Sequence, residues 1–251
     1  MSFVKQNSIV RKIWGNADTI LFIFGGAAAE FSLNKAVDWL YFTGKLPSDP
    51  LGRLFSTVTY AQQILFLDET SALKAIDKIA AIHHGVENNR GAKIPDWAYQ
   101  DVLFMLIYYS VSAFELLERK LTDAEKEEIF DVFYRMGSRM GLKNLPKNYA
   151  HWLVVREQHL QKNLAKSTFT TDLYLQYRKN LGWIRYFVLL EGQKLIVPNR
   201  VKNLLSISSF SVLRPCVWGY KVARKISFDK IIKAALLPNE YKMQIYALDV
   251  G

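Results

Sequence analysis

Hydrophobic residues along this chain recur three and four positions apart, the spacing that places them on one face of an α-helix. The run Leu73, Ile76 and Ile79 is a clear example, and it leads to His83. Alternation of apolar and polar residues, which is typical of a half-buried strand, does not recur. No internal repeat, linker or low-complexity tract interrupts the pattern. The sequence therefore predicts one all-α domain that spans residues 1–251.

Capping and turn residues divide this pattern into separate helices. Pro95 stands where a helix would begin, and Thr122 with Glu125 has the spacing of a capping box. Gly85 and Gly141 stand where helices would end. The predicted helices cover about residues 18–40, 50–67, 70–85, 95–119, 123–140, 147–163 and 170–180. An apolar segment follows at 183–190, a polar loop is expected at 87–94, and the pattern predicts no definite element after residue 198.

Composition and charge exclude several classes of protein. Half of the 251 residues are hydrophobic and 14% are aromatic, which is enough apolar material for a large core and excludes a disordered chain. The 33 Lys and Arg residues exceed the 23 Asp and Glu residues, giving a net charge of +10. Because the chain has no Gly/Arg-rich tract and no recognisable nucleic-acid-binding module, we expect no nucleic acid among its partners. Cys216 is the only cysteine, which excludes a disulfide scaffold, and a buried, unreactive thiol is expected.

Two apolar runs, Ile20–Ala29 and Val102–Phe114, are the candidates for membrane or targeting segments. Both are shorter than the ~20 apolar residues that cross a bilayer, so we expect them to be buried helices. The first run ends in three alanines and resembles a secretory signal, but Asn16 and Asp18 interrupt its approach. The sequence therefore favours a cytoplasmic protein.

The segment 198–233 is strongly basic. It carries eight Lys and Arg residues against one acid, Asp229. Apolar and aromatic residues, among them Phe210, Trp218 and Phe228, are interleaved with these charges. Two interpretations remain open. The simpler one is a solvated basic face on C-terminal helices, and the other is a surface that makes peripheral contact with an anionic membrane.

Common catalytic and metal-binding motifs are missing from the chain. It has four histidines and no Glu-x-x-His, so a di-iron carboxylate centre is not expected. The His-Glu-x-x-His, Gly-x-Ser-x-Gly and Gly-x-Gly-x-x-Gly motifs are absent as well. The remaining candidate is His83, preceded by Arg53 and Thr57 on one face of the previous predicted helix. A buried imidazole needs a hydrogen bond or a metal, and the residues alone favour a hydrogen-bonded core histidine.

Three stretches, in this order, resemble a known family. Residues 49–57 read Asp-Pro-Leu-Gly-Arg-Leu-Phe-Ser-Thr, and residues 82–86 read Ile-His-His-Gly-Val. A Pro-Asp-Trp helix start at 95–97 then leads through a long apolar helix to a Leu-Thr-x-x-Glu turn at 121–125. Over residues 14–165, the chain resembles the helical haem-dependent oxygenases that include the latex-clearing rubber oxygenases and the MpaB-type oxygenases.

The resemblance implies a haem b cofactor whose iron is bound by His83, which occupies the histidine position of the family's Ile-His-x-x-Val motif. His84 is then expected to point about 100° away around the helix. Arg53 and Thr57 match family residues near the haem, and they are catalytic candidates together with Ser56. Ser56 stands where rubber oxygenases carry a lysine, which argues against polyisoprene as the substrate.

The resemblance also implies cationic partners for the haem propionates. Arg53, Arg90 and Lys93 are the candidates, and for the last two a solvated loop is the alternative. The residues expected to wall the pocket are aromatic: Phe22, Phe24, Phe55, Phe104 and Tyr108. The implied function is an oxygenase that uses O2 on a lipophilic, unsaturated small molecule of the isoprenoid or lipid kind. A non-catalytic haem sensor or carrier and a cofactor-free helical lipid-binding protein are the alternatives.

Overall fold

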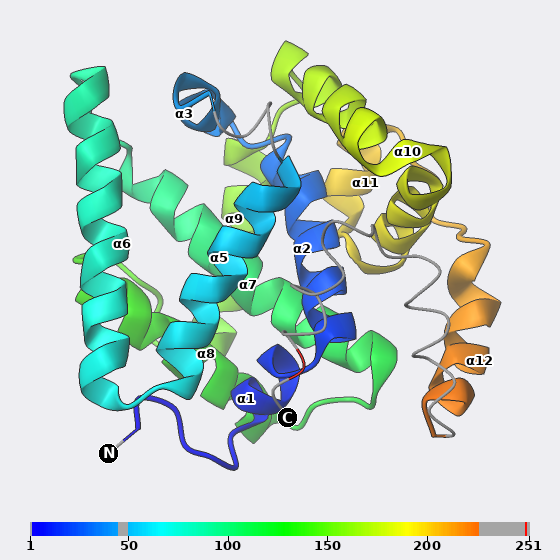
Figure 1. Ribbon diagram of the computed structural model, residues 1–251, viewed down its shortest axis with the longest axis horizontal. Coiled ribbons are helices and arrows are strands. Elements are labelled where there is room, and N and C mark those ends of the chain that lie inside the picture. The colour runs from blue at the N-terminus through cyan, green and yellow to red at the C-terminus, as the bar shows by residue number, and fades with distance from the viewer. Residues whose placement is uncertain (1, 45–49, 226–248, 250–251) are drawn as a thin grey trace.

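The computed structural model describes residues 2–44, 50–225 and 249, with the backbone alone at residues 50–51, 53–56 and 222–225. In this part of the chain every regular element is a helix, which confirms the predicted all-α class (Figure 1). The helices are α1 (Ile9–Trp14), α2 (Ala17–Phe31), α3 (Val37–Phe42), α5 (Pro50–Phe66), α6 (Glu69–Arg90), α7 (Asp96–Leu117), α8 (Asp123–Arg139), α9 (Tyr149–Asn163), α10 (Thr168–Ile196), α11 (Asn199–Leu205) and α12 (Leu213–Lys225). Two isolated bridges, Ser2 with Asp68 and Asn34 with Leu164, are the β-type pairings between described residues.

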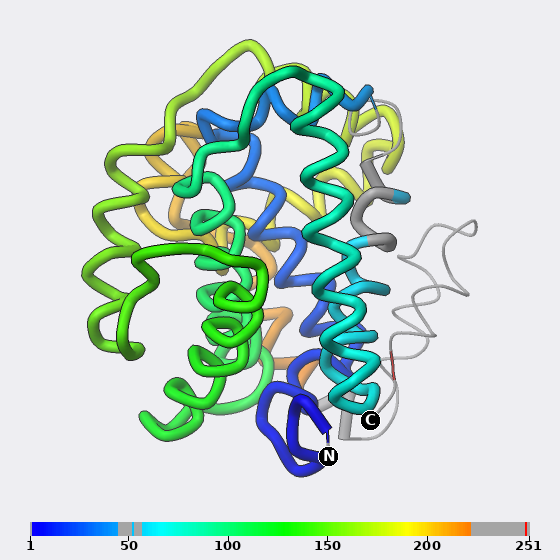
Figure 2. Tube along the Cα trace, turned by 90° about the vertical axis from the view of Figure 1, so that its left-hand side faces the viewer, coloured from blue at the N-terminus to red at the C-terminus, as the bar shows by residue number. Residues whose placement is uncertain are grey.

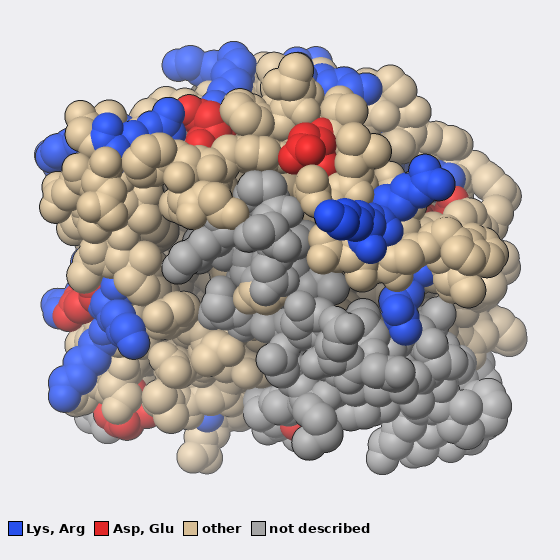
Figure 3. Space-filling view, turned by 45° about the horizontal axis from the view of Figure 1, so that its top comes forward, with Lys and Arg blue, Asp and Glu red and all other residues tan. Residues whose placement is uncertain are grey.

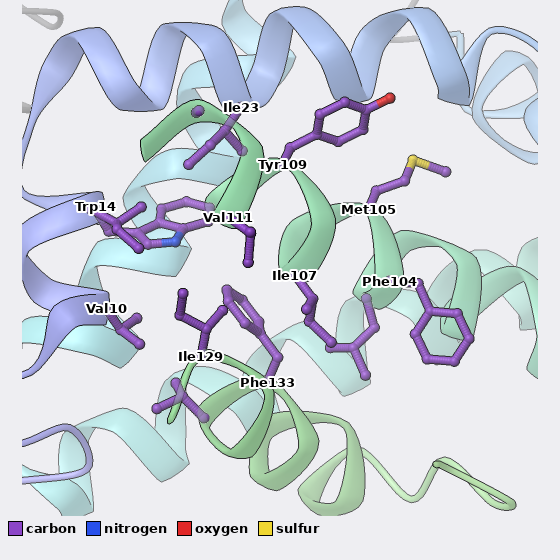
Figure 4. Close-up of a cluster of buried hydrophobic side chains, with 14 of the residues drawn as sticks. Val10, Trp14, Ile23, Phe104, Met105, Ile107, Tyr109, Val111, Ile129 and Phe133 are labelled. Atoms are coloured by element: carbon purple, nitrogen blue, oxygen red, sulfur yellow. The ribbon is translucent and has the colours of Figure 1, made fainter. Parts of the chain in front are cut away.

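Helix α7 lies at the centre of the fold. It packs along α2 on one side and against α8 on another, and Figure 4 shows Val111 and Ile107 of α7 directed towards Ile129 and Phe133 of α8. The contact with α2 is close because Gly26 has no side chain. A Cβ atom there would lie 2.3 Å from the Tyr109 ring, so this crossing requires glycine.

The remaining helices surround this centre. Helices α5 and α6 run antiparallel along one side of the molecule, while α10 and α12 lie on the opposite side (Figures 1 and 2). The short α1 anchors one end of the core through Trp14, whose indole N–H donates to the hydroxyl of Ser110 at 3.0 Å. One continuous hydrophobic core includes buried residues from Phe3 to Val201.

Several predicted helix ends are correct because local capping decides them. Helix α7 follows Pro95, and α5 covers the predicted 50–67 segment to within a residue. The Thr122 hydroxyl accepts from the Glu125 N–H while the Glu125 carboxylate accepts from the Thr122 N–H, which confirms the capping box. Asn16, which interrupts the signal-like run, caps α2 by accepting the N–H groups of Asp18 and Thr19.

Glu125 also makes a specific contribution to stability in acid. Hydrogen bonds from Arg119 and the Thr122 N–H lower the pKa of its carboxyl from an ordinary 4.5 to about 2. A lowered pKa stabilises the folded state above the unfolded-state value, so this contribution is lost as the pH falls from about 4.5 to about 2. The Arg119 side chain is 55% exposed, so solvent screens the pair. We expect Glu125→Gln to lower the free energy of unfolding by about 0.5–1 kcal/mol at pH 7 and by less at pH 2. Urea unfolding at both pH values measures this, and an equal loss at both would contradict it.

The predicted ends of two other helices are wrong. The 18–40 helix stops at Phe31 because Asn34 interrupts it, with its side-chain oxygen accepting the Ala36 N–H and its amide donating to Asp101. Helix α6 continues through Gly85 and through the first part of the expected 87–94 loop. It ends at Gly91, whose φ of 67° is the left-handed conformation that terminates helices. A glycine inside a helix costs only ~1 kcal/mol, which the rest of the 22-residue helix offsets.

The C-terminal third contains more helix than predicted. The expected 170–180 helix and 183–190 segment belong to α10, whose backbone leaves helical geometry at Gly182 (φ 72°, ψ 172°). Helices α11 and α12 occupy part of the basic segment for which the sequence predicted no element. Residues 226–233 of that segment, with Phe228 and Asp229, lie outside the described residues.

Helix α7 is the one described helix whose length and mean hydropathy of 1.3 would allow it to cross a membrane. It is longer than the Val102–Phe114 run considered from the sequence. The apolar window of this helix is 67% buried within the fold, as in the core helix of a globular protein.

Candidate functional site

A large apolar cavity lies between the central pair α2 and α7 and the surrounding helices α5, α6, α10 and α12. Its volume is about 1350 Å³, which exceeds the ~300–1,000 Å³ of most small-molecule pockets. Aliphatic and aromatic side chains make up most of the described wall, and the few polar groups include Thr57, His83 and Arg185. The cavity is therefore suited to a large, flat or lipophilic ligand with a small number of polar contacts.

The structure brings His83 and Thr57 to the same cavity from two adjacent helices. His83 lies on α6 and is half-buried, with its Nδ1 atom shielded from solvent. Thr57 lies on α5, which packs against α6. The apolar stripe of α6 that includes Ile79 places His83 on the inward side of its helix, as its spacing predicted.

His84 occupies a different environment from its neighbour. Its side chain is 70% exposed, and its Nδ1 atom lies 3.0 Å from a carboxylate oxygen of Glu87. This confirms the expectation that successive residues on the helix point in different directions. His83 is thus the only histidine among the described residues that line the cavity.

Tyr99 packs on the ring of His83 and Glu87 holds Tyr99 in place, and the sequence did not single out either residue. The Tyr99 ring meets His83 edge-on at 5.1 Å, and its hydroxyl donates to the Glu87 carboxylate at 3.1 Å. The Ile94 N–H donates to the same carboxylate. Burial raises the pKa of Glu87, but hydrogen bonds from His84, Ile94 and Tyr99 outweigh it and the net pKa is lowered. Burial and the Glu87 charge raise the pKa of Tyr99, so the phenol stays protonated as the donor.

The three catalytic candidates on α5 are only partly described. Helix α5 carries Arg53, Ser56 and Thr57 within two turns, as predicted. Thr57 lines the cavity, whereas the side chains of Arg53, Ser56 and Phe55 lie outside the described part of the chain. The first residue of the sequence motif, at position 49, lies outside it as well.

The other two propionate candidates do not line the cavity. The Arg90 guanidinium donates to Asp38 at 2.7 Å and stacks on Trp39 at 4.1 Å from the ring centre, so it holds α3 against α6. Trp39 lines the cavity, which places Arg90 behind the wall. Lys93 is exposed after the end of α6 and does not belong to the described lining. Among the described residues, the cation in the cavity lining is Arg185 of α10, which the sequence analysis missed.

Two of the aromatic wall predictions are right and two are wrong. Phe22 and Phe24 line the cavity. Phe104 instead packs on Trp152 and His159, and Tyr108 lies beneath the Arg156 guanidinium, because this face of α7 is turned towards α9. The aromatic residues found in the lining are Phe22, Phe24, Phe31, Trp39, Phe42, Tyr60, Tyr99, Phe133, Tyr177 and Tyr220. Cys216 is exposed at the edge of the cavity, which corrects the expectation of a buried thiol.

Polar groups buried outside the cavity form two structural networks that the sequence did not reveal. Glu30 of α2 accepts two hydrogen bonds from Arg156 of α9 and one from the Tyr109 hydroxyl. Asp101 of α7 accepts from the amides of Asn34 and Asn163, and one of its oxygens lies 2.5 Å from His159 Nδ1. Both networks join elements that are far apart in the sequence, and none of these residues lines the cavity.

The described residues contain no group of three or more His, Cys, Asp or Glu side chains that would hold a metal ion. One imidazole in an apolar enclosure matches the demand of a haem, whose porphyrin occupies four coordination positions.

The chain matches one family of known proteins. Residues 12–213 match the family model described as ER-bound oxygenase mpaB/B′/rubber oxygenase, catalytic domain. The match covers most of the chain, extends beyond the 14–165 resemblance and includes every helix that lines the cavity up to the start of α12. No curated protein and no solved structure gives a significant match.

Proposed function

The chain belongs to the family of MpaB-type and rubber oxygenase catalytic domains, and from this we propose that it is a haem b-dependent oxygenase acting on a lipophilic, unsaturated small molecule. Membership makes the protein an oxygenase-family enzyme that uses O2 and an organic substrate. The cofactor, the axial ligand and the substrate class are the proposal.

One observation carries the proposal: a single histidine, His83, lines a cavity of about 1350 Å³ whose walls are otherwise mostly apolar. Its Nδ1 atom is shielded from solvent, and Tyr99 with Glu87 fixes the ring from the protein side. An axial histidine requires neighbouring residues that hold its ring in place, because the residues behind a metal ligand set its orientation. We assign His83 as the axial ligand.

Cationic side chains would hold the propionates. Arg185 lines the cavity, and Arg53 lies on α5 one helical turn before Thr57, so these two are the principal candidates. Arg90 would have to exchange its ion pair with Asp38 for a propionate, and Lys93 would have to reach in from an exposed position.

Haem bound in this way supplies an iron centre for the reduction and activation of O2. The chain's own residues provide the surroundings. Thr57 places a hydroxyl donor in the cavity, and the Ser56 hydroxyl is a second candidate on the same helix. The apolar walls exclude water and bind hydrocarbon, which favours a lipophilic substrate over a polar one. Ser56 in place of a lysine continues to argue against polyisoprene.

An absorption spectrum of the protein expressed with a haem precursor tests the cofactor. We expect a Soret band from one haem per chain, and O2 uptake above autoxidation with squalene or linoleic acid as probes of isoprenoid and lipid substrates. Colourless protein after haem reconstitution would overturn the proposal. A normal Soret band with no O2 uptake on either probe would favour the non-catalytic haem carrier.

A further inference from the structure

Helix α10 presents an unusual apolar surface after its break at Gly182. Trp183, Ile184 and Phe187 are 75%, 52% and 48% exposed. Phe187 and Ile184 lie four and seven positions before Glu191, so all three residues lie on one side of the helix. These large side chains therefore form a row that faces away from the core.

The start of α12 extends this row. The Glu191 carboxylate accepts the Val212 N–H at 2.8 Å, and the Glu191 carbonyl accepts the Ser211 hydroxyl at 3.0 Å. These bonds place the loop before α12 one helical turn from Phe187. The loop and α12 add three further exposed side chains. Together the apolar patch consists of Trp183, Ile184, Phe187, Phe210, Val212 and Trp218, of which Phe210 and Trp218 are 69% and 74% exposed.

Cationic residues flank the apolar patch. Lys202 of α11 and Arg214 of α12 lie close enough that burial and the Arg214 charge lower the pKa of Lys202. Neither residue forms an ion pair with any described residue. Glu191, the acid between α10 and α12, is already paired with Lys194. On the face shown in Figure 3, Lys and Arg side chains lie in separate groups between broad uncharged areas.

Exposed Trp and Phe side chains beside cations that pair with no described acid match the requirements of a lipid interface. Aromatic residues partition into the headgroup region, and cations beside them attract anionic lipids. Soluble monomers rarely expose a contiguous group of large apolar side chains without a binding role. The unpaired charges favour an anionic bilayer over a second copy of this basic chain.

We infer that the apolar patch docks this protein peripherally on an anionic bilayer. The docking helices are also cavity walls, because Leu181 and Val188 of α10 and Leu213 and Val217 of α12 line the cavity. Docking would thus bring a lipid reservoir against the wall of the substrate cavity. This last consequence rests on the proposed function, whereas the docking itself does not.

Flotation with lipid vesicles tests the docking without any need for haem. The full-length protein is mixed with phosphatidylcholine vesicles with or without phosphatidylserine and centrifuged through a density gradient. We expect flotation with the phosphatidylserine vesicles, release at about 0.5 M salt, and about a tenfold smaller bound fraction for the triple variant Trp183→Ser, Phe187→Ser and Trp218→Ser. Leu153→Ser with Val154→Ser is the matched control, since these α9 residues are 48% and 58% exposed but lie outside the apolar patch.

A second variant separates charge from apolar contact. Lys202→Glu with Arg214→Glu keeps the apolar patch and is expected to abolish the preference for phosphatidylserine vesicles. Circular dichroism confirms that each variant is folded. Undiminished flotation of the triple variant, an equal loss in the α9 control, or no flotation of the unmodified protein would overturn the inference. Concentration-dependent dimers that the triple variant dissolves, without vesicle binding, would reassign the apolar patch to self-association.

Discussion

We expect that replacing His83 with alanine removes the Soret band and the O2 uptake of the haem-loaded protein, and that His84→Ala leaves both largely intact. The physical reason is that the two histidines occupy different environments. His83 lines the apolar cavity with its Nδ1 atom shielded, while the His84 side chain is 70% exposed and contacts Glu87. Loss of the axial imidazole leaves the iron without its proposed protein ligand, so activity should fall to background rather than by a modest factor.

The two histidines make a matched pair of variants, because they are adjacent on one helix and carry the same chemical group. Circular dichroism should show similar helical content for both variants. His83→Gly adds a rescue test, since free imidazole should restore part of the Soret band if the only defect is the missing ligand. A His83→Ala protein that retains an unshifted spectrum would place the iron ligand elsewhere.

Breaking the Glu30–Arg156 pair should cost about 3–5 kcal/mol of unfolding free energy, the largest stability effect that we expect from a single side chain. Glu30 is fully buried and Arg156 is 4% exposed. The guanidinium donates two bonds of 2.5 Å to the two carboxylate oxygens, and Tyr109 donates a third at 2.9 Å. Glu30→Ala removes the acceptor of all three, and it leaves a buried positive charge with no counter-charge.

Urea unfolding followed by circular dichroism measures this loss, with the exposed pair Arg139–Asp77 as the control. That pair has similar two-bond geometry, but its side chains are 48% and 50% exposed, so Asp77→Ala should cost no more than about 1 kcal/mol. The double variant Glu30→Leu with Arg156→Met should recover much of the loss because it removes both charges. Equal losses of unfolding free energy for Glu30→Ala and Asp77→Ala would contradict the prediction, because burial would then not determine the cost of breaking the pair.

The predicted helix ends succeeded or failed according to how local their cause is. The capping box at Thr122 and the start of α7 after Pro95 depend on residues within one turn, and both are correct. Gly85 was taken as a helix end, yet the helix passes through it, since one glycine is a small cost beside the packing of α6. The end of α2 depends on Asn34 meeting Asp101 of another helix, which no local pattern contains.

The residues of the candidate site also divide into those with a local signal in the sequence and those placed by the packing of distant helices. The motif around His83 and the turn of helix that carries Thr57 are short-range features, and the structure places both at one cavity. Glu87 escaped notice because it was assigned to a loop, although it lies one turn after His83. Arg185 carried no recognisable signal, because its position in the lining follows from how α10 packs against the centre.

By itself, the sequence determined the all-α class, most helix starts and the inward position of His83, because helical periodicity and capping are encoded within a few neighbouring residues. Only the tertiary structure decided which polar residues are buried together and which helix faces enclose the cavity. Glu30 and Arg156 are 126 positions apart, and α10 and α12 reach the cavity from the far end of the chain. Such contacts depend on the packing of whole helices, which local spacing does not specify.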